Sequence, residues 1–101
     1  MILKVFSIFD NATKAYNQPF FMLTNAEAIR AFQNMALDES TQIFRNPNDF
    51  NLYYLGAFDN TEATFKMDMK DLGSAVLFQK KAEDDQVKKL FESKEVKHEV
   101  N

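Results

Sequence analysis

The sequence predicts a single α+β domain: a small antiparallel sheet of four to five strands with one helix packed on it, followed by an amphipathic tail helix. Short segments of alternating apolar residues are separated by turn formers, as in strands joined by hairpins. One segment between them repeats its apolar residues every three or four positions, as in a helix. The expected order is strand, strand, helix, strand, strand, strand over residues 1–79, and a charged, partly helical tail over residues 80–101.

The first two strands are expected to form a hairpin. In residues 2–9 both alternating sets are largely apolar, which is typical of a strand covered on both faces, so we place it centrally in the sheet. Turn formers occupy residues 10–14, and a second strand is expected over 16–23. Pro19 cannot donate a ladder hydrogen bond, which favours an edge position or a strand start.

A helix is expected to begin at Thr24 and end near Asp38. Thr24 and Glu27 have the spacing of a capping box, in which each side chain satisfies a free backbone donor at the helix start. An apolar stripe follows, made of Ala28, Ile29, Phe32, Met35 and Ala36. This stripe should face the sheet.

The remaining elements follow a long loop over residues 39–49, which Ile43 and Phe44 are expected to hold against the body. A strand over 50–58 should place Phe50, Leu52, Tyr54 and Phe58 on one face and Tyr53, Leu55 and Ala57 on the other, with a bulge or close approach at Gly56. Residues 63–69 alternate cleanly and predict a half-buried strand. A short last strand over 74–78 and a marginal helix over 83–94 complete the prediction.

Catalytic equipment is scarce in this sequence. There is no Cys, which excludes disulfides and thiolate zinc sites and favours a reducing compartment, and two glycines cannot build a phosphate-binding loop. The one histidine, His98, lies in the tail, where a solvated side chain is expected. The acidic pairs Asp68/Asp71 and Asp59/Glu62 could hold a metal for a nuclease, but they sit at predicted turns, where such residues are common. We expect no enzyme activity, no catalytic or metal-binding residues and no cofactor.

A single-stranded nucleic acid would require exposed rings for base stacking and cations along the phosphates. The candidate residues for this role are Lys4, Lys14, Tyr16, Arg30, Tyr53, Tyr54, Lys66 and Lys70. The alternative is that the rings pack in the core and the lysines only solubilise the chain. A net charge of −3 lacks the basic footprint of a duplex-DNA binder, so a nucleic-acid role requires a local basic patch.

The tail carries a short apolar stripe of Val87, Leu90 and Phe91. It could bind a protein partner, it could compete with nucleic acid for a basic groove, or it could lie on the domain as a short amphipathic helix. A chain this small also gains burial by self-association, so a homodimer is plausible. The apolar first nine residues are too short to span a membrane and lack the features of a signal peptide, so no membrane association is expected.

Five segments together resemble a known family: MILKVFSIFD at 1–10, QPFF at 18–21, AIRAF at 28–32, PNDF at 47–50 and LYYLGAFD at 52–59. In this order they resemble the small nonstructural protein of gokushovirus-type microviruses, which are single-stranded DNA phages of the Microviridae. The resemblance covers roughly residues 1–79 and does not extend to the tail. It implies a phage protein of the bacterial host cytoplasm that is absent from the capsid and serves genome replication or packaging, and it transfers no catalytic residues.

The resemblance and the aromatic content favour a single-stranded DNA-binding or DNA replication and packaging accessory protein. The excess of acidic over basic residues favours the alternative, a protein–protein adaptor in phage replication or procapsid assembly. Such an adaptor contacts phage or host proteins and no nucleic acid.

Overall fold

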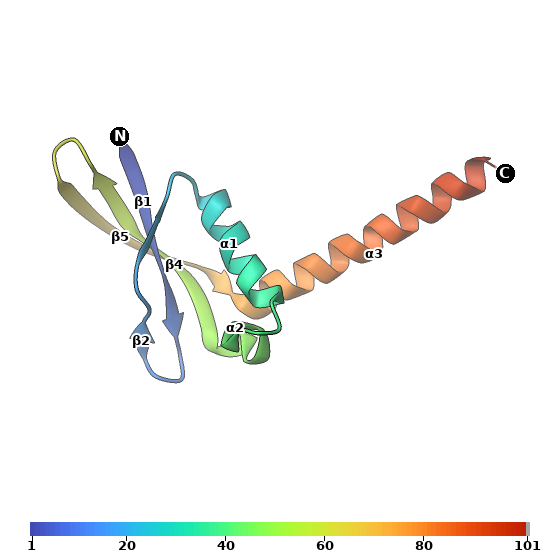
Figure 1. The fold of residues 1–101 in the computed structure, drawn as a ribbon, viewed down its shortest axis with the longest axis horizontal. Coiled ribbons are helices and arrows are strands. Elements are labelled where there is room, and N and C mark those ends of the chain that lie inside the picture. Colours follow the sequence, from blue (N-terminus) through green and yellow to red (C-terminus); the bar gives the residue numbers. More distant parts are fainter. Residues whose placement is uncertain (101) are drawn as a thin grey trace.

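The computed structural model describes the backbone of residues 1–100 and the side chains of residues 1–92. The expectation for His98 therefore lies outside the described side chains. The elements, shown in Figure 1, are β1 (Ile2–Asp10), β2 (Ala15–Tyr16), β3 (Phe20–Met22), α1 (Asn25–Leu37), α2 (Gln42–Arg45), the 3₁₀ turn η1 (Pro47–Asp49), β4 (Phe50–Asp59), β5 (Thr64–Ser74) and α3 (Ala75–Val100).

The five strands form one antiparallel sheet, which confirms the predicted α+β class. β1 is central: it pairs with β4 on one side and with both β2 and β3 on the other, and β5 pairs with β4 at the opposite edge. The central position of β1 agrees with its sequence, because Val5 to Ile8 are all buried. The predicted second strand over 16–23 is divided into β2 and β3. Pro19 lies in the gap between them, because it cannot donate a hydrogen bond to the ladder.

The core lies between one face of the sheet and the helices. β1 and β4 contribute Phe6, Ile8, Phe50 and Leu52, and the helices contribute Ala28, Phe32 and Ala36 from α1, Ile43 from α2 and Ala75 from α3. All three helices thus add their buried residues to the same side of the sheet. We call this side the helix face and the opposite side the open face.

The start of α1 has the predicted capping geometry. The Thr24 hydroxyl accepts a hydrogen bond from the backbone N–H of Glu27 at 3.2 Å, and the Glu27 carboxylate accepts one from the N–H of Leu23 at 3.4 Å. The helix ends at Leu37, with Asp38 as its C-cap. The predicted loop over 39–49 contains α2, whose N-cap is Thr41, and η1.

A bulge in β4 corrects the predicted face assignment. Phe6 of β1 pairs with Tyr54 and Val5 pairs with Gly56, so Leu55 is an extra residue between them. Beyond such a bulge the alternation of faces is reversed. Ala57 therefore lies on the helix face and Phe58 on the open face, the opposite of the sequence prediction.

The predicted strand over 74–78 is wrong, because α3 begins at Ala75. The short apolar run fits either structure by pattern alone, and tertiary contacts favour the helix. Ala75 is fully buried, the Phe78 ring meets the Phe32 ring edge-on at 5.5 Å, and the Gln79 amide donates to the Ala36 carbonyl oxygen at 2.6 Å. These contacts recur at helical spacing and fix the first turn of α3 to α1.

Beyond that first turn, α3 leaves the body of the molecule and extends away from the sheet (Figure 1). It is longer than the marginal helix expected over 83–94. Of the helices in the part of the chain that the structure describes, none has an apolar stretch of the length needed to cross a bilayer.

Candidate nucleic-acid interface

Two rows of paired residues cross the helix face beside the N-terminal end of α1. In the first row Lys4 pairs with Ala57, and Ala57 pairs with Lys66. Side chains directly opposite each other on neighbouring strands point to the same face. Because the residue between them is an alanine, no large side chain separates the two lysines.

In the second row Tyr54 lies between Phe6 and Lys70. The Tyr54 ring meets the Phe6 ring edge-on at 5.6 Å, which ties it to the core. The ammonium groups of Lys4 and Lys70 each lie 5.9 Å from the centroid of the Tyr54 ring. Two cations at this distance are attracted by the ring. We call Lys4, Tyr54, Ala57, Lys66 and Lys70 the lysine–tyrosine surface.

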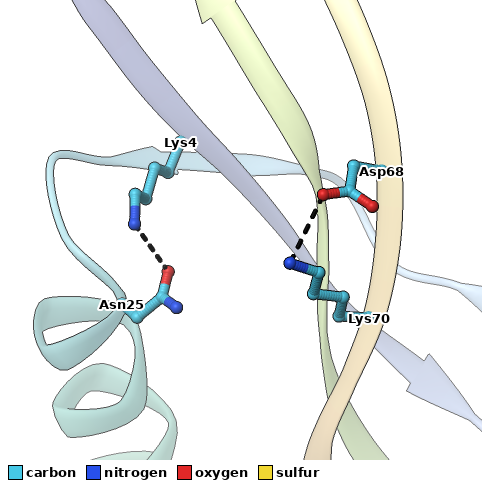
Figure 2. Close-up of polar contacts among 4 residues, drawn as sticks. All are labelled: Lys4, Asn25, Asp68 and Lys70. Carbon is cyan, nitrogen blue, oxygen red and sulfur yellow. Dashed lines mark hydrogen bonds and ion pairs between the residues drawn. The ribbon is translucent and has the colours of Figure 1, made fainter.

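Figure 2 shows how two of these lysines are held. Lys4 donates a hydrogen bond to the Asn25 side-chain oxygen at 3.3 Å, which ties β1 to the first turn of α1. Lys70 lies 3.4 Å from a carboxylate oxygen of Asp68, and both side chains are more than half exposed. An ion pair this exposed contributes about 0–1 kcal/mol, so the Lys70 ammonium is free to exchange Asp68 for another anion.

The local charge of this surface differs from that of the whole chain. Three lysines and the one carboxylate paired with them give a local charge of +2 (3 − 1), against −3 for the whole chain. The strands therefore gather cations that are spread along the sequence. The sequence indicated that such a local patch was required but not where it would form.

Two predicted cations are not brought to this surface. Arg30 lies five residues after Asn25, which places it about 140° around α1 from that residue. It lines a shallow hollow with Ala26 and Glu27. Lys14 is in the turn before β2, with a left-handed backbone (φ 60°).

The other two predicted tyrosines lie on the open face. Tyr16 and Tyr53 form a cluster with Phe9, in which the ring centroids are 4.6 to 6.0 Å apart. Tyr16 and Tyr53 are therefore not part of the surface that holds Tyr54.

Partial burial raises the pKa of Tyr53 above its usual 10.0, with smaller contributions from the Asp71 carboxylate and from Tyr16.

The half-buried strand predicted over 63–69 is exposed throughout. Phe65 and Met67 are 46% and 60% exposed on the open face, where Phe65 pairs with Phe58 and Met67 with Gly56. The alternation correctly separated the apolar set from the polar set. It could not indicate that no helix covers this face.

The acidic pairs considered as metal ligands have local structural roles. The Asp59 carboxylate accepts hydrogen bonds from the backbone N–H groups of Thr61 and Glu62. Asp71 accepts from the Asn51 side chain and from the N–H of Gly73. Within the described side chains, no three His, Asp or Glu residues gather in a group that could hold a metal ion.

The predicted partner-binding residues of the tail project into solvent. Val87, Leu90 and Phe91 of α3 are 51 to 64% exposed. The alternative in which this helix lies on the domain is therefore wrong, because α3 extends away from it.

The sequence did not indicate that Ala57 belongs to the lysine–tyrosine surface or that Asn25 contacts it through Lys4. Asn25 lies inside the predicted capping box of Thr24 and Glu27 and had no predicted contact of its own, and Ala57 was assigned to the wrong face. The signal for Ala57 was Gly56, at which a bulge was predicted, but a bulge in sequence does not specify which residue is extra.

Comparison with protein-family models gave a match that covers most of the chain. A family model described as "Phage ORF5 protein" matches residues 3–78, a span that begins in β1 and ends in the first turn of α3. Searches among curated proteins and among solved structures gave no match.

Proposed function

Because the chain belongs to the phage ORF5 protein family, we propose that it is a phage protein that binds single-stranded DNA through the lysine–tyrosine surface. The observation that carries the proposal is that the ammonium groups of Lys4 and Lys70 each lie 5.9 Å from the centroid of the Tyr54 ring. Rings and cations are the two components that single-strand binding requires.

Each residue has a role in this proposal. The partly exposed Tyr54 ring offers a stacking face to a base, and Phe6 holds it from behind. Lys4, Lys66 and Lys70 contact the phosphates next to this base. The small side chain of Ala57 leaves room for the DNA strand to approach the sheet. Since every base has a π-face, such binding is tolerant of sequence and sensitive to salt.

The proposed biological setting follows from the family and from the resemblance described above. The chain acts as a nonstructural protein of a gokushovirus-type microvirus in the bacterial host cytoplasm, during replication or packaging of the single-stranded genome. It acts by binding, without catalysis and without a cofactor.

The direct test is fluorescence anisotropy of labelled oligo(dT) titrated with the purified full chain at low salt. We expect saturable binding that weakens as salt is added, and a weaker response with a duplex of the same length. An unchanged anisotropy at low salt would overturn the proposal.

A second candidate function is a protein–protein adaptor, favoured by the exposed apolar side chains of α3. Val87, Leu90 and Phe91 lie on a helix that extends clear of the sheet, where a phage or host protein of replication or procapsid assembly can reach them. The adaptor proposal requires a phage or host protein that the parent chain captures and the variant Leu90→Lys/Phe91→Lys does not, although circular dichroism shows that the variant is folded. A partner captured equally well by this variant would contradict it.

A further inference from the structure

The open face of the sheet presents large apolar side chains to solvent. Phe21 of β3 and Phe65 of β5 are 52% and 46% exposed, and Met67 is 60% exposed. The Phe58 ring lies between the two aromatic residues: its centroid is 6.1 Å from that of Phe21, and it pairs with Phe65 across the strands. These four residues form a continuous patch over β3, β4 and β5.

The area of this face is comparable with one side of a stable protein interface. Tyr16, Phe21, Phe65, Met67 and Met69 are each about half exposed. With about 200 Å² per large side chain, they leave roughly 500 Å² of apolar surface on one copy. Partly exposed Phe9, Tyr53 and Phe58 add to it, toward the roughly 800 Å² per partner of a standard interface. Patches above a few hundred Å² mark interaction sites.

The charge of the open face argues against nucleic acid as its occupant. Among the side chains that the strand register places there, Asp71 is the charged one, opposite Tyr53. Bases could stack on the rings, but the strand residues on this face include no lysine or arginine to contact phosphates, in contrast to the helix face. An apolar, nearly uncharged surface instead suits a copy of itself, because no strong like charges are brought together.

We propose that two copies of this chain associate through their open faces, sheet against sheet. Face-to-face packing of two twisted sheets about 10 Å apart would bury the Phe21, Phe58, Phe65 and Met67 side chains of both copies. The lysine–tyrosine surfaces then lie on the two outer sides of the dimer. The association does not depend on DNA binding.

The test is sedimentation velocity of the full chain over a range of concentrations, without DNA. We expect a concentration-dependent species of twice the chain mass. The double variant Phe65→Thr/Met67→Thr introduces β-branched residues, which are well suited to an exposed strand. It should weaken the dimer by about 100-fold or more, because two large apolar side chains are lost from each copy. Its circular dichroism and its affinity for oligo(dT) per chain should match those of the parent.

The matched control is Leu90→Thr, which removes a similarly exposed apolar side chain from α3 and should leave the dimer unchanged. A parent chain that stays monomeric at every concentration would overturn the proposal. Dissociation by Leu90→Thr with no effect of Phe65→Thr/Met67→Thr would also overturn it, and would place the interface on α3.

Discussion

Gly56 of β4 lies directly against the backbone of Lys66 on β5. A Cβ placed on Gly56 would collide with the Lys66 carbonyl oxygen, and the Gly56 backbone has φ +154°, which side-chain-bearing residues rarely adopt. This close approach follows the bulge at Leu55 and holds Lys66 in the row that it shares with Lys4.

We expect Gly56→Ala to lower the free energy of unfolding by about 3 kcal/mol, because the collision adds to the backbone strain. Gly73→Ala is the matched control: it also has a positive φ (126°), but its Cβ would meet the Phe78 ring at an ordinary 3.5 Å. It should cost only about 1 kcal/mol. Urea unfolding followed by circular dichroism measures both. Equal losses would mean that the approach to Lys66 is not tight.

The lysine–tyrosine surface predicts a specific salt dependence. For single-stranded DNA, each phosphate contact contributes about −0.7 to the slope of log K against log salt concentration. We expect Lys4→Gln/Lys66→Gln/Lys70→Gln to weaken oligo(dT) binding and to reduce the magnitude of this slope by about 2. Anisotropy titrations at several salt concentrations provide the measurement.

The control for this variant removes the same charge elsewhere, through Lys81→Gln/Lys88→Gln/Lys89→Gln on α3. These lysines are exposed, and they belong to α3, which extends away from the sheet (Figure 1). The slope should stay at the parent value. If both triple variants change the slope equally, the effect is one of net charge, and the surface has no special role.

Tyr54 should contribute through its ring and not through its hydroxyl. Tyr54→Leu keeps an apolar side chain against Phe6 but removes the π-face, and we expect it to weaken oligo(dT) binding by about 1–3 kcal/mol. Tyr54→Phe keeps the ring and should bind almost as the parent does. Equal affinities of the Leu and Phe variants, with both folded, would remove Tyr54 from the binding surface.

The raised pKa of Tyr53 predicts a loss of stability at high pH. Its cause is first partial burial and then the Asp71 carboxylate. In the unfolded chain Tyr53 ionises near the usual 10.0, whereas the folded state keeps the proton to higher pH, so the unfolded state gains stability above pH 10.0. Comparison of urea unfolding of the parent with Tyr53→Phe should show equal pH profiles below this value and a steeper loss for the parent above it. Parallel profiles on both sides would contradict the shift.

Local signals in the sequence predicted much of the fold. The Thr24–Glu27 cap depends on residues three apart and could be identified without any tertiary information. The doubly apolar β1 likewise indicated its central position. In contrast, the reversed faces of Ala57 and Phe58 depend on how β4 pairs with β1, and the sequence of one strand does not contain that information.

The candidate site was predictable in its residue types and not in its grouping. Lys4, Tyr54, Lys66 and Lys70 come from three strands, and only their register brings them together. Tyr16 and Tyr53 met the same criteria by type but belong to the other face. The exposure of Phe65 and Met67 was also hidden, because alternation separates two faces without indicating which of them another element covers.

The edge position of β5 has a consequence for how copies of this chain meet. A long exposed edge strand normally invites further strands to add, and such growth leads to fibres. The pairing of β5 with β4 is interrupted by irregularities at Tyr53 and at Leu55. In addition, β5 carries the charged residues Lys66, Asp68 and Lys70. A regular new strand cannot lie in register along such an edge. We therefore expect the irregular, charged edge of β5 to disfavour the addition of further strands, and with it the growth of open-ended aggregates.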